Sequence, residues 1–358
     1  DCAGESSCHT GNNAMQGIDS IDIDIDGWTY AAGWSLRALG AVACQSTRNK
    51  QALMKLGCCE LATQMLKTRG LECERGSNKA RELLLEGGCF AMAQLAQDNS
   101  DIQGRFLEAG AGEVLSRVLL THRDSIDVSR ECCIALYTLV GENEEAQEQV
   151  GSATEVLKVL VASSVRLTQK KIDPNRTICL LQWIWYVLSM FSKCPGNRAM
   201  LFKYGVCDCI IDLLKKEKEL NRIVVLYVCV SLSNMTTLHE SVVYMGEEGV
   251  SRGIFLCATN YGDDIEICLC LAQAVGTLAQ IPASRVWLGA AGVCTSVVNI
   301  LENHQNNLAL IESTLHAVAH LSDCNKSNCR KLGGAGACQL LPKLLLKFGH
   351  GSTTVAEW

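Results

Sequence analysis

Residues 195–236 read PGNRAMLFKYGVCDCIIDLLKKEKELNRIVVLYVCVSLSNMT and predict three successive helices. Pro195 opens a short first helix, because proline is favoured in the first turn. Gly205 ends it, since glycine adopts the left-handed C-terminal geometry without a Cβ penalty. Two further runs repeat apolar residues at helical spacing: Ile210, Leu213 and Leu214 in one, and Val225, Val228, Cys229 and Leu232 in the other.

This order of a short, a medium and a long helix recurs along the chain, with a glycine after each first helix. The glycines are Gly57, Gly110, Gly151, Gly205, Gly249, Gly292 and Gly336, at intervals of 53, 41, 54, 44, 43 and 44 residues. Four of these six intervals fall in the range of roughly 40–47 residues that is typical of α-helical repeats. The two long intervals contain charged insertions at 67–77 and 167–175.

Three groups of segments resemble the three helices of an armadillo repeat. NKQALMKLG (49–57), GNRAMLFKYG (196–205) and NKSNCRKLG (325–333) resemble the first helix, and GEVLSRVLL, ATEVLKVLV, CDCIIDLLK and CTSVVNILE resemble the second. The long segments that end in MAQLA, LYTLV, LSMFS, VSLSNM, VGTLA and AVAHLS resemble the third. This resemblance implies an all-α, right-handed solenoid of three-helix repeats. HEAT repeats, with two helices per unit, fit these three-part intervals less well.

The register divides the chain into one solenoid and two flanking segments. We expect the solenoid over residues 28–350, with a leading third helix at 28–44, six full repeats and a seventh repeat without its third helix. Residues 1–27 are expected to form a flexible lead-in, extended at 21–26 where Ile and Asp alternate, and 351–358 a C-terminal tail. Because the sequence begins at Asp1 rather than methionine, we expect a trimmed or partial chain.

The composition is that of a globular protein, with 48% apolar residues, 20% charged residues and only four prolines. The net charge of -6 argues weakly against a general nucleic-acid or anionic-membrane surface. No run of 18 uncharged apolar residues is present, so the sequence predicts no transmembrane helix and no direct insertion into a membrane.

The 21 cysteines are odd in number and lie in a chain too long to need disulfide staples. Many follow the repeat glycines, such as Cys58 and Cys207, or lie inside apolar helical runs, such as Cys132 and Cys229. Free cysteine in such positions behaves as a small buried hydrophobe. We therefore expect reduced structural thiols and a cytoplasmic or nuclear location.

The resemblance implies that the third helices line a concave groove. In importin-α-like members this groove carries Trp and Asn four residues apart, but here only Asn234 keeps the asparagine and no tryptophan occupies its position. The groove is therefore not importin-α-like, and a mixed surface is expected to bind a protein or peptide segment through apolar anchors. The candidate groove residues are Phe90, Gln94, Thr138, Tyr186, Met190, Asn234, Gln273, His316 and His320.

The aromatic cluster Trp183, Trp185 and Tyr186 has two members on one helix face, while Trp185 points elsewhere. At least one tryptophan is therefore expected to be buried against a neighbouring repeat.

No GxSxG, GxxxxGK[ST] or HExxH motif occurs, so the sequence predicts no enzyme and no cofactor. One weak metal candidate combines His316, His320 and Cys324 at i, i+4, i+8 spacing with Cys329 five residues later. Two histidines and two cysteines are an acceptable zinc set, but cysteine is abundant throughout this chain.

The main functional hypothesis is a non-catalytic interaction scaffold that binds a partner segment in its concave groove, with no nucleic acid. One alternative is a regulatory or autoinhibitory armadillo domain of a larger enzyme that senses a small ligand. A further alternative is a Cys/His metal or redox sensor. The sequence leaves the oligomeric state open.

Overall fold

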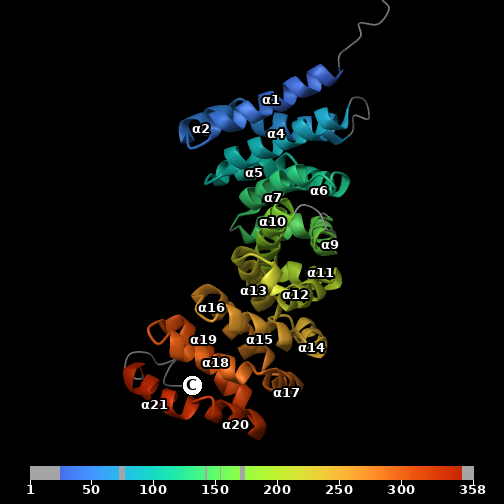
Figure 1. Ribbon diagram of the computed structural model, residues 1–358. Coiled ribbons are helices and arrows are strands. Elements are labelled where there is room, and N and C mark those ends of the chain that lie inside the picture. The colour runs from blue at the N-terminus through green and yellow to red at the C-terminus, as the bar shows by residue number, and fades with distance from the viewer. Residues whose placement is uncertain (1–24, 72–76, 142, 154, 170–173, 349–358) are drawn as a thin grey trace, which may run out of the picture.

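The computed structural model describes residues 25–71, 77–141, 143–153, 155–169 and 174–348. In these ranges the chain forms twenty-one α-helices and no strand, which confirms the all-α prediction. Figure 1 shows the helices stacked in chain order from α1 at one end to α21 at the other. Each repeat consists of a first, a second and a third helix, so neighbours in sequence are also neighbours in space.

The first helices are α2 (Thr47–Lys55), α5 (Ser100–Glu108), α8 (Glu144–Ala153), α11 (Pro195–Lys203), α14 (His239–Glu247), α17 (Pro282–Ala291) and α20 (Lys326–Gly334). The second helices are α3 (Cys58–Met65), α6 (Ala111–Thr121), α9 (Val156–Gln169), α12 (Val206–Lys215), α15 (Val250–Asn260), α18 (Val293–Asn303) and α21 (Ala337–Phe348). The third helices are α1 (Ile25–Ala43), α4 (Asn78–Ala96), α7 (Ile126–Val140), α10 (Pro174–Lys193), α13 (Arg222–Met235), α16 (Ile265–Leu278) and α19 (Leu308–Ser322). A π-helical segment, Leu66–Leu71, follows α3, and a 3-10 turn, Glu217–Glu219, precedes α13.

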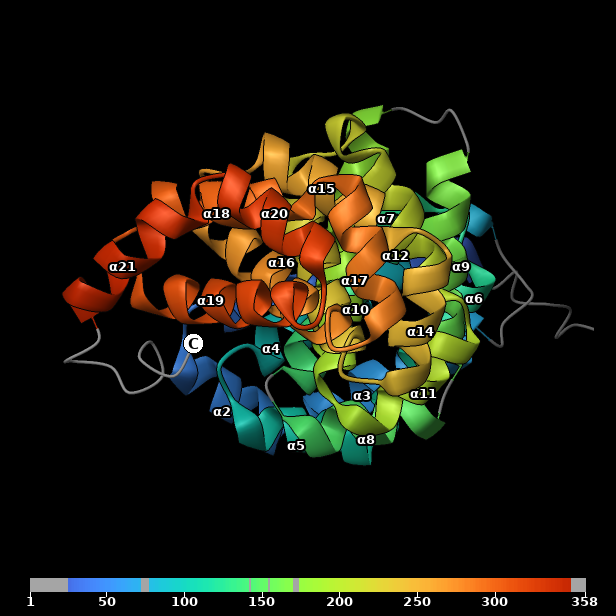
Figure 2. The same ribbon diagram turned by 90° about the horizontal axis from the view of Figure 1, so that it is seen from below.

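One hydrophobic core runs through the whole solenoid, from Leu36 in α1 to Leu344 in α21. Consecutive third helices pack on one another, α1 on α4, α4 on α7, and so on to α16 on α19. They form a continuous layer that is stacked along the length of the molecule in Figure 1, and Figure 2 looks along this length, so that the repeats overlap in it. We call the exposed side of this layer the third-helix face.

Six of the seven glycines that were predicted to end a first helix do so. Gly205, for example, has φ of 83° and separates α11 from α12, a conformation that costs an L-residue with a Cβ atom. Gly151 was predicted to be such a stop, and this is wrong, because α8 runs through it to Ala153. A Cβ atom at Gly151 would lie 2.2 Å from Asn197 Oδ1, so glycine is required there for close helix packing.

Several predicted boundaries shift or fall outside the described residues. The helix expected at 28–44 begins at Ile25, so residues 25–27 are helical rather than part of a lead-in. Asp26 Oδ1 accepts a hydrogen bond from the Ser77 N–H at 2.6 Å and so ties this end to α4. The remainder of the lead-in and the tail lie outside the described residues, and the division into lead-in, solenoid and tail stays a prediction. Part of each insertion is helical, since the π-helical segment extends to Leu71 and α9 to Gln169.

The prediction of a buried tryptophan is confirmed by Trp185, which is fully buried. Its indole N–H donates to Ser164 Oγ at 3.0 Å. Ser164 belongs to α9, so this hydrogen bond joins two helices of one repeat rather than two repeats.

Among the described helices, none is long and apolar enough by itself to cross a membrane. Only α17 and α18 taken together meet that test, as a pair bent by 74°.

Polar side chains of the first helices bind the C-terminal carbonyls of the third helices. The last carbonyls of a helix have no partner within the helix and need donors from elsewhere. Gln103 Nε2 donates to Ala96 O of α4 and to Thr138 O of α7, at 3.1 and 2.9 Å. The buried Arg285 similarly bridges Ala279 O after α16 and Asp323 O after α19, at 2.6 and 2.5 Å.

We predict that Arg285→Met destabilises the protein by about 2–4 kcal/mol, because hydrogen bonds from a charged donor are lost while Ala279, one of the accepting residues, stays buried. Thermal and denaturant unfolding of the full chain measure this change. Arg330→Met is the matched control, since Arg330 is exposed on α20. Equal stability of the two variants would contradict the bridging role of Arg285.

The placement of the described cysteines predicts two reactivity classes. Twelve are buried and five are exposed, namely Cys44, Cys179, Cys324, Cys329 and Cys338. Burial, and then the charge of Glu60, raises the pKa of the Cys59 thiol to about 12, so the reactive thiolate hardly forms at neutral pH. With a thiol reagent at pH 7.5 we expect the exposed cysteines to react within the fast phase and the twelve buried ones only after denaturation. Fast reaction of the buried class, resolved by peptide mapping, would contradict the structural role of these thiols.

Candidate functional site

The third-helix face carries an aromatic patch at its centre. We define this patch by four half-buried side chains, Tyr137 of α7, Trp183 and Tyr186 of α10, and Tyr227 of α13. The patch therefore spans three successive repeats. Aromatic side chains offer a large contact area at low entropic cost, and they are enriched where proteins bind partners.

The three tyrosine rings form one stack. The centroids of Tyr137 and Tyr186 lie 4.2 Å apart, and those of Tyr186 and Tyr227 lie 4.3 Å apart. Tyr186 donates its O–H to the Tyr137 hydroxyl oxygen at 2.7 Å. Trp183 is tilted against the stack, 5.7 Å from Tyr186 and 6.3 Å from Tyr137. Burial raises the pKa of Tyr227, so its hydroxyl stays protonated at neutral pH.

Ion pairs border the patch at the N-terminal ends of these helices. On α7, Arg130 Nη1 lies 3.1 Å from Asp127 Oδ1, and its Nη2 lies 3.1 Å from Glu131 Oε1. Arg176 of α10 also contacts Asp127. These pairs neutralise the border on the side of α7 and α10.

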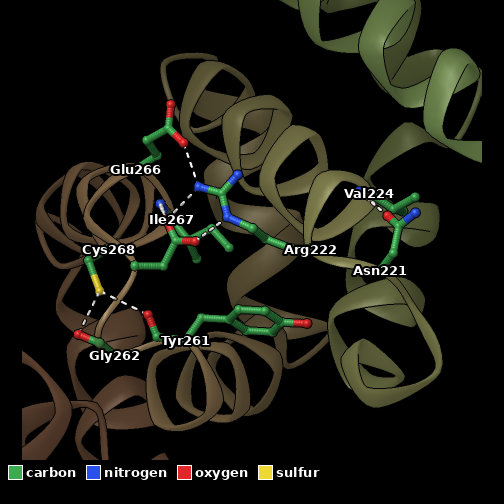
Figure 3. Close-up of polar contacts among 9 residues, drawn as sticks. Asn221, Arg222, Val224, Tyr261, Gly262, Glu266, Ile267 and Cys268 are labelled. Atoms are coloured by element: carbon green, nitrogen blue, oxygen red, sulfur yellow. Dashed lines mark hydrogen bonds and ion pairs between the residues drawn. The ribbon is translucent and has the colours of Figure 1, made fainter.

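A second network lies between α13 and α16 (Figure 3). Arg222 Nε lies 2.5 Å from Asp264 Oδ2, and its Nη2 lies 2.5 Å from Glu266 Oε2. Hydrogen bonds to Asp264 and Glu266 raise the pKa of Arg222. Burial acts to raise the pKa of Asp264, but the hydrogen bonds from Arg222 and the Ile267 N–H outweigh it and lower that pKa. One arginine thus faces two carboxylates, and this side of the border keeps a net negative charge.

The N-terminal part of the face carries Phe90 and Gln94 of α4, both half-buried. The Arg37 guanidinium of α1 lies 5.3 Å from the Phe90 ring centroid, within cation–π range. Burial, and next the charge of Asp127, raises the pKa of the nearby Glu86 carboxyl.

In the C-terminal part of the third-helix face, the amide side chains of two candidate groove residues form hydrogen bonds with neighbouring third helices. Asn234 Nδ2 of α13 donates to Ser192 Oγ of α10 at 2.9 Å and to Ser189 O at 3.3 Å. Gln273 of α16 is exposed, and its Oε1 accepts from Ser233 Oγ at 3.0 Å. Both side chains lie on the predicted face, but part of their hydrogen-bonding capacity joins repeats to each other.

His316 and His320 lie on α19 with their Nε2 atoms 3.1 Å apart, so one ring donates to the other. Burial, and then His320, lowers the pKa of His316. A Cβ atom at Gly276 of α16 would lie 2.4 Å from His316 Nδ1, which shows how closely the two helices approach at this ring.

The weak metal candidate is not assembled. Within the described residues, no group of three or more His, Cys, Asp or Glu side chains is placed to hold a metal ion. Cys324 is exposed in the loop after α19 with φ of 50°, and Cys329 is exposed on α20, where its thiol donates to Ser322 O at 3.3 Å. The predicted i, i+8 alignment of Cys324 with His316 fails because α19 ends at Ser322, before that cysteine.

Two further candidates lie differently from expectation. Met190 is only 4% exposed and belongs to the core, so it offers no surface to a partner, which corrects its assignment to the groove. Thr138 is half-buried, and its hydroxyl donates to Ala135 O at 3.0 Å and Ile134 O at 3.1 Å within α7.

Sequence reasoning missed Tyr137 and Tyr227 as site residues. It compared the same position of the third helix in every repeat. The stacked tyrosine lies three residues after that position in α7 and three residues before it in α13, so the comparison did not reveal the stack. The available signal was the presence of an aromatic residue near this position in three successive third helices.

The lowered pKa of His316 predicts a loss of stability in acid. The unfolded chain accepts a proton near pH 6.5, while the folded chain resists it. This contribution is therefore present above about pH 6.5 and is lost as the pH falls through the lower folded pKa. Thermal unfolding at pH 7.5 and 5.5 should show a smaller acid-induced loss for His316→Gln than for the parent chain. His239→Gln, an exposed position on α14, serves as the control. If His316→Gln and the parent chain lose the same thermal stability between pH 7.5 and pH 5.5, the His316 side chain does not contribute to the loss of stability in acid.

No protein-family model and no curated protein matches the sequence. Solved structures do match in fold. A designed armadillo repeat protein superposes with a TM-score of 0.57 at 16% identity, over 74% of this chain and 100% of that chain. A chain from a crystal structure of computationally designed armadillo repeat proteins for modular peptide recognition superposes with a TM-score of 0.57 at 16% identity, over 73% of this chain and 99% of that chain.

A natural comparison comes from a structure that describes a phosphorylation switch controlling the interaction between cadherin and beta-catenin. It gives a TM-score of 0.72 at 14% identity, over 92% of this chain and 58% of that chain. Such identities show the fold alone. The chain has the armadillo-repeat fold, as its sequence resemblance predicted.

Proposed function

We propose, starting from the armadillo-repeat fold, that this chain is a non-catalytic scaffold that binds a segment of a partner protein along its third-helix face. The observation that carries the proposal is the aromatic patch, which presents four large side chains from three repeats on one surface. Binding energy in protein interfaces concentrates on such residues. The designed armadillo proteins for modular peptide recognition support the same use of this fold.

The candidate groove residues that remain exposed or half-buried extend this surface on both sides of the patch. Phe90 and Gln94 lie towards α1, and Gln273, His316 and His320 lie towards α21. A segment that follows the third-helix face would contact one repeat after another. We infer a protein or peptide partner rather than nucleic acid, since the charged side chains bordering the patch are paired.

We keep the cytoplasm or nucleus as the proposed location, which rests on the reduced thiols. The regulatory-domain alternative stays a hypothesis, because it concerns sequence outside this chain. The metal-sensor alternative loses its four-residue site, since only the two histidines lie together.

The test uses a random peptide library displayed on phage and selected on the full chain. We predict that Val230→Arg combined with Gln273→Arg reduces binding of the selected peptides at least tenfold, because two new cations stand on the third-helix face. Val230 is half-buried and Gln273 is exposed, so the double variant should keep a melting temperature close to that of the parent chain. Alanine at Tyr186 would be a poorer test, since it also removes the stack that joins α7, α10 and α13.

The matched control is Asn299→Arg, which adds a cation at an exposed position on the second helix α18. It should leave peptide binding unchanged. Peptides that tolerate the double variant but are lost with Asn299→Arg would move the binding site away from the third-helix face and overturn the proposal.

A further inference from the structure

Two histidines lie one helical turn apart near the C-terminal end of the third-helix face. His316 and His320 are both half-buried on α19, and their spacing of four residues places them on one side of that helix. Their Nε2 atoms lie 3.1 Å apart, and their ring planes meet at 79° with the centroids 4.5 Å apart. The scaffold function uses these side chains only as surface, so it does not account for two imidazole nitrogens that converge.

The separation of the two nitrogens fits a metal chelate. An imidazole nitrogen binds a divalent transition-metal ion such as Zn²⁺ at about 2.0–2.1 Å. Two nitrogens that are 3.1 Å apart and both at this distance from one ion form an angle of about 100° at the ion. This angle lies between the right angle of square-planar or octahedral coordination and the wider tetrahedral angle. The pair therefore has the geometry of a two-nitrogen chelate before any ion binds.

The neighbouring third helix holds the His316 ring in this orientation. A Cβ atom at Gly276 of α16 would lie 2.4 Å from His316 Nδ1 and 3.0 Å from its Cε1, so this edge of the ring lies against α16. Nδ1 therefore faces α16, and Nε2 is the nitrogen that meets His320. Burial also lowers the pKa of His316, so its ring is neutral at pH 7.5, and neutral imidazole is the form that binds metals. A ring held in this way loses little freedom when an ion binds.

We propose that His316 and His320 chelate one divalent transition-metal ion of the class that favours imidazole, such as Cu²⁺ or Ni²⁺. Water fills the remaining coordination positions, since no third His, Cys, Asp or Glu side chain of the described residues is placed to join the pair. A site with two protein ligands differs from structural zinc sites, which have four. It suits ions that accept tetragonal coordination by nitrogen and oxygen, which are Cu²⁺ and Ni²⁺.

Binding requires one proton to move within a ring. Without metal, one Nε2 carries a proton and donates it to the other Nε2 in a hydrogen bond. In the complex both Nε2 lone pairs go to the ion, so the ring that carried this proton must carry it on Nδ1 instead. Both rings stay neutral, and no proton has to leave the protein.

The probe is NiCl₂, titrated into the full chain at pH 7.5 in a calorimeter. The exposed cysteines are first alkylated with iodoacetamide under native conditions, because thiols compete for such ions. We expect one saturable site, which His316→Gln and His320→Gln each weaken at least tenfold because a single imidazole remains. His239→Gln, at an exposed position on α14, should leave the affinity unchanged. MgCl₂ should not bind at this site, since Mg²⁺ prefers oxygen ligands.

Two further measurements separate loss of the site from a folding defect. An ion that binds only the native state raises the melting temperature, so Ni²⁺ should stabilise the parent chain and His239→Gln but neither His316→Gln nor His320→Gln. Each variant's melting temperature without metal shows whether it is folded. Electron paramagnetic resonance of one equivalent of Cu²⁺ on the alkylated parent chain needs no variant, and it should show coupling to two imidazole nitrogens.

Three results would overturn the inference. The first is the absence of saturable Ni²⁺ binding to the parent chain. The second is an affinity for Ni²⁺ in His316→Gln and His320→Gln that equals that of the parent chain. The third is a Cu²⁺ spectrum without coupling to two imidazole nitrogens.

Discussion

The armadillo stack depends on polar side chains that reach from most of the first helices to the carbonyl ends of the third helices. In a solenoid each repeat contacts only its neighbours, so the register between repeats must be fixed locally. The donors occupy one position, seven residues before the repeat glycine: Lys50, Gln103, Arg198, Arg285 and, as a weaker thiol donor, Cys329. In α14 the apolar Val242 occupies this position and is buried in the core.

The side chains that we propose for partner binding also pack the repeats together. Tyr137, Tyr186 and Tyr227 pack three repeats against one another, and their exposed edges form part of the third-helix face. The ion pairs that border the patch, such as Arg222 with Asp264, add little stability where they are exposed. An aromatic surface bordered by ion pairs is the chemical character of this site.

The fold was predictable from sequence because its signals are local. Six repeat glycines mark helix ends through their own backbone geometry, and apolar spacing marks the helices between them. Gly151 shows the limit of such local signals. This glycine is required for close packing against Asn197, which lies 46 positions further along the chain, and a local sequence pattern does not reveal that contact. The site was predicted only in outline. Met190 was assigned to the surface although it is in the core, and the diagonal stack was missed because its residues meet only after three helices pack.

The tyrosine stack also affects how the solenoid bends. A rod of repeats flexes where neighbouring third helices can separate at little cost. Between α7 and α13, bending must part rings in van der Waals contact and stretch the hydroxyl contact of Tyr186 with Tyr137. Between α13 and α16 no ring stack is present among the described residues, and the polar contacts are the exposed Ser233–Gln273 bond and the Arg222 network. Bending at the centre of the solenoid must therefore break ring contacts that the interface of α13 with α16 lacks, and a long partner on the proposed face would meet a more fixed curvature there.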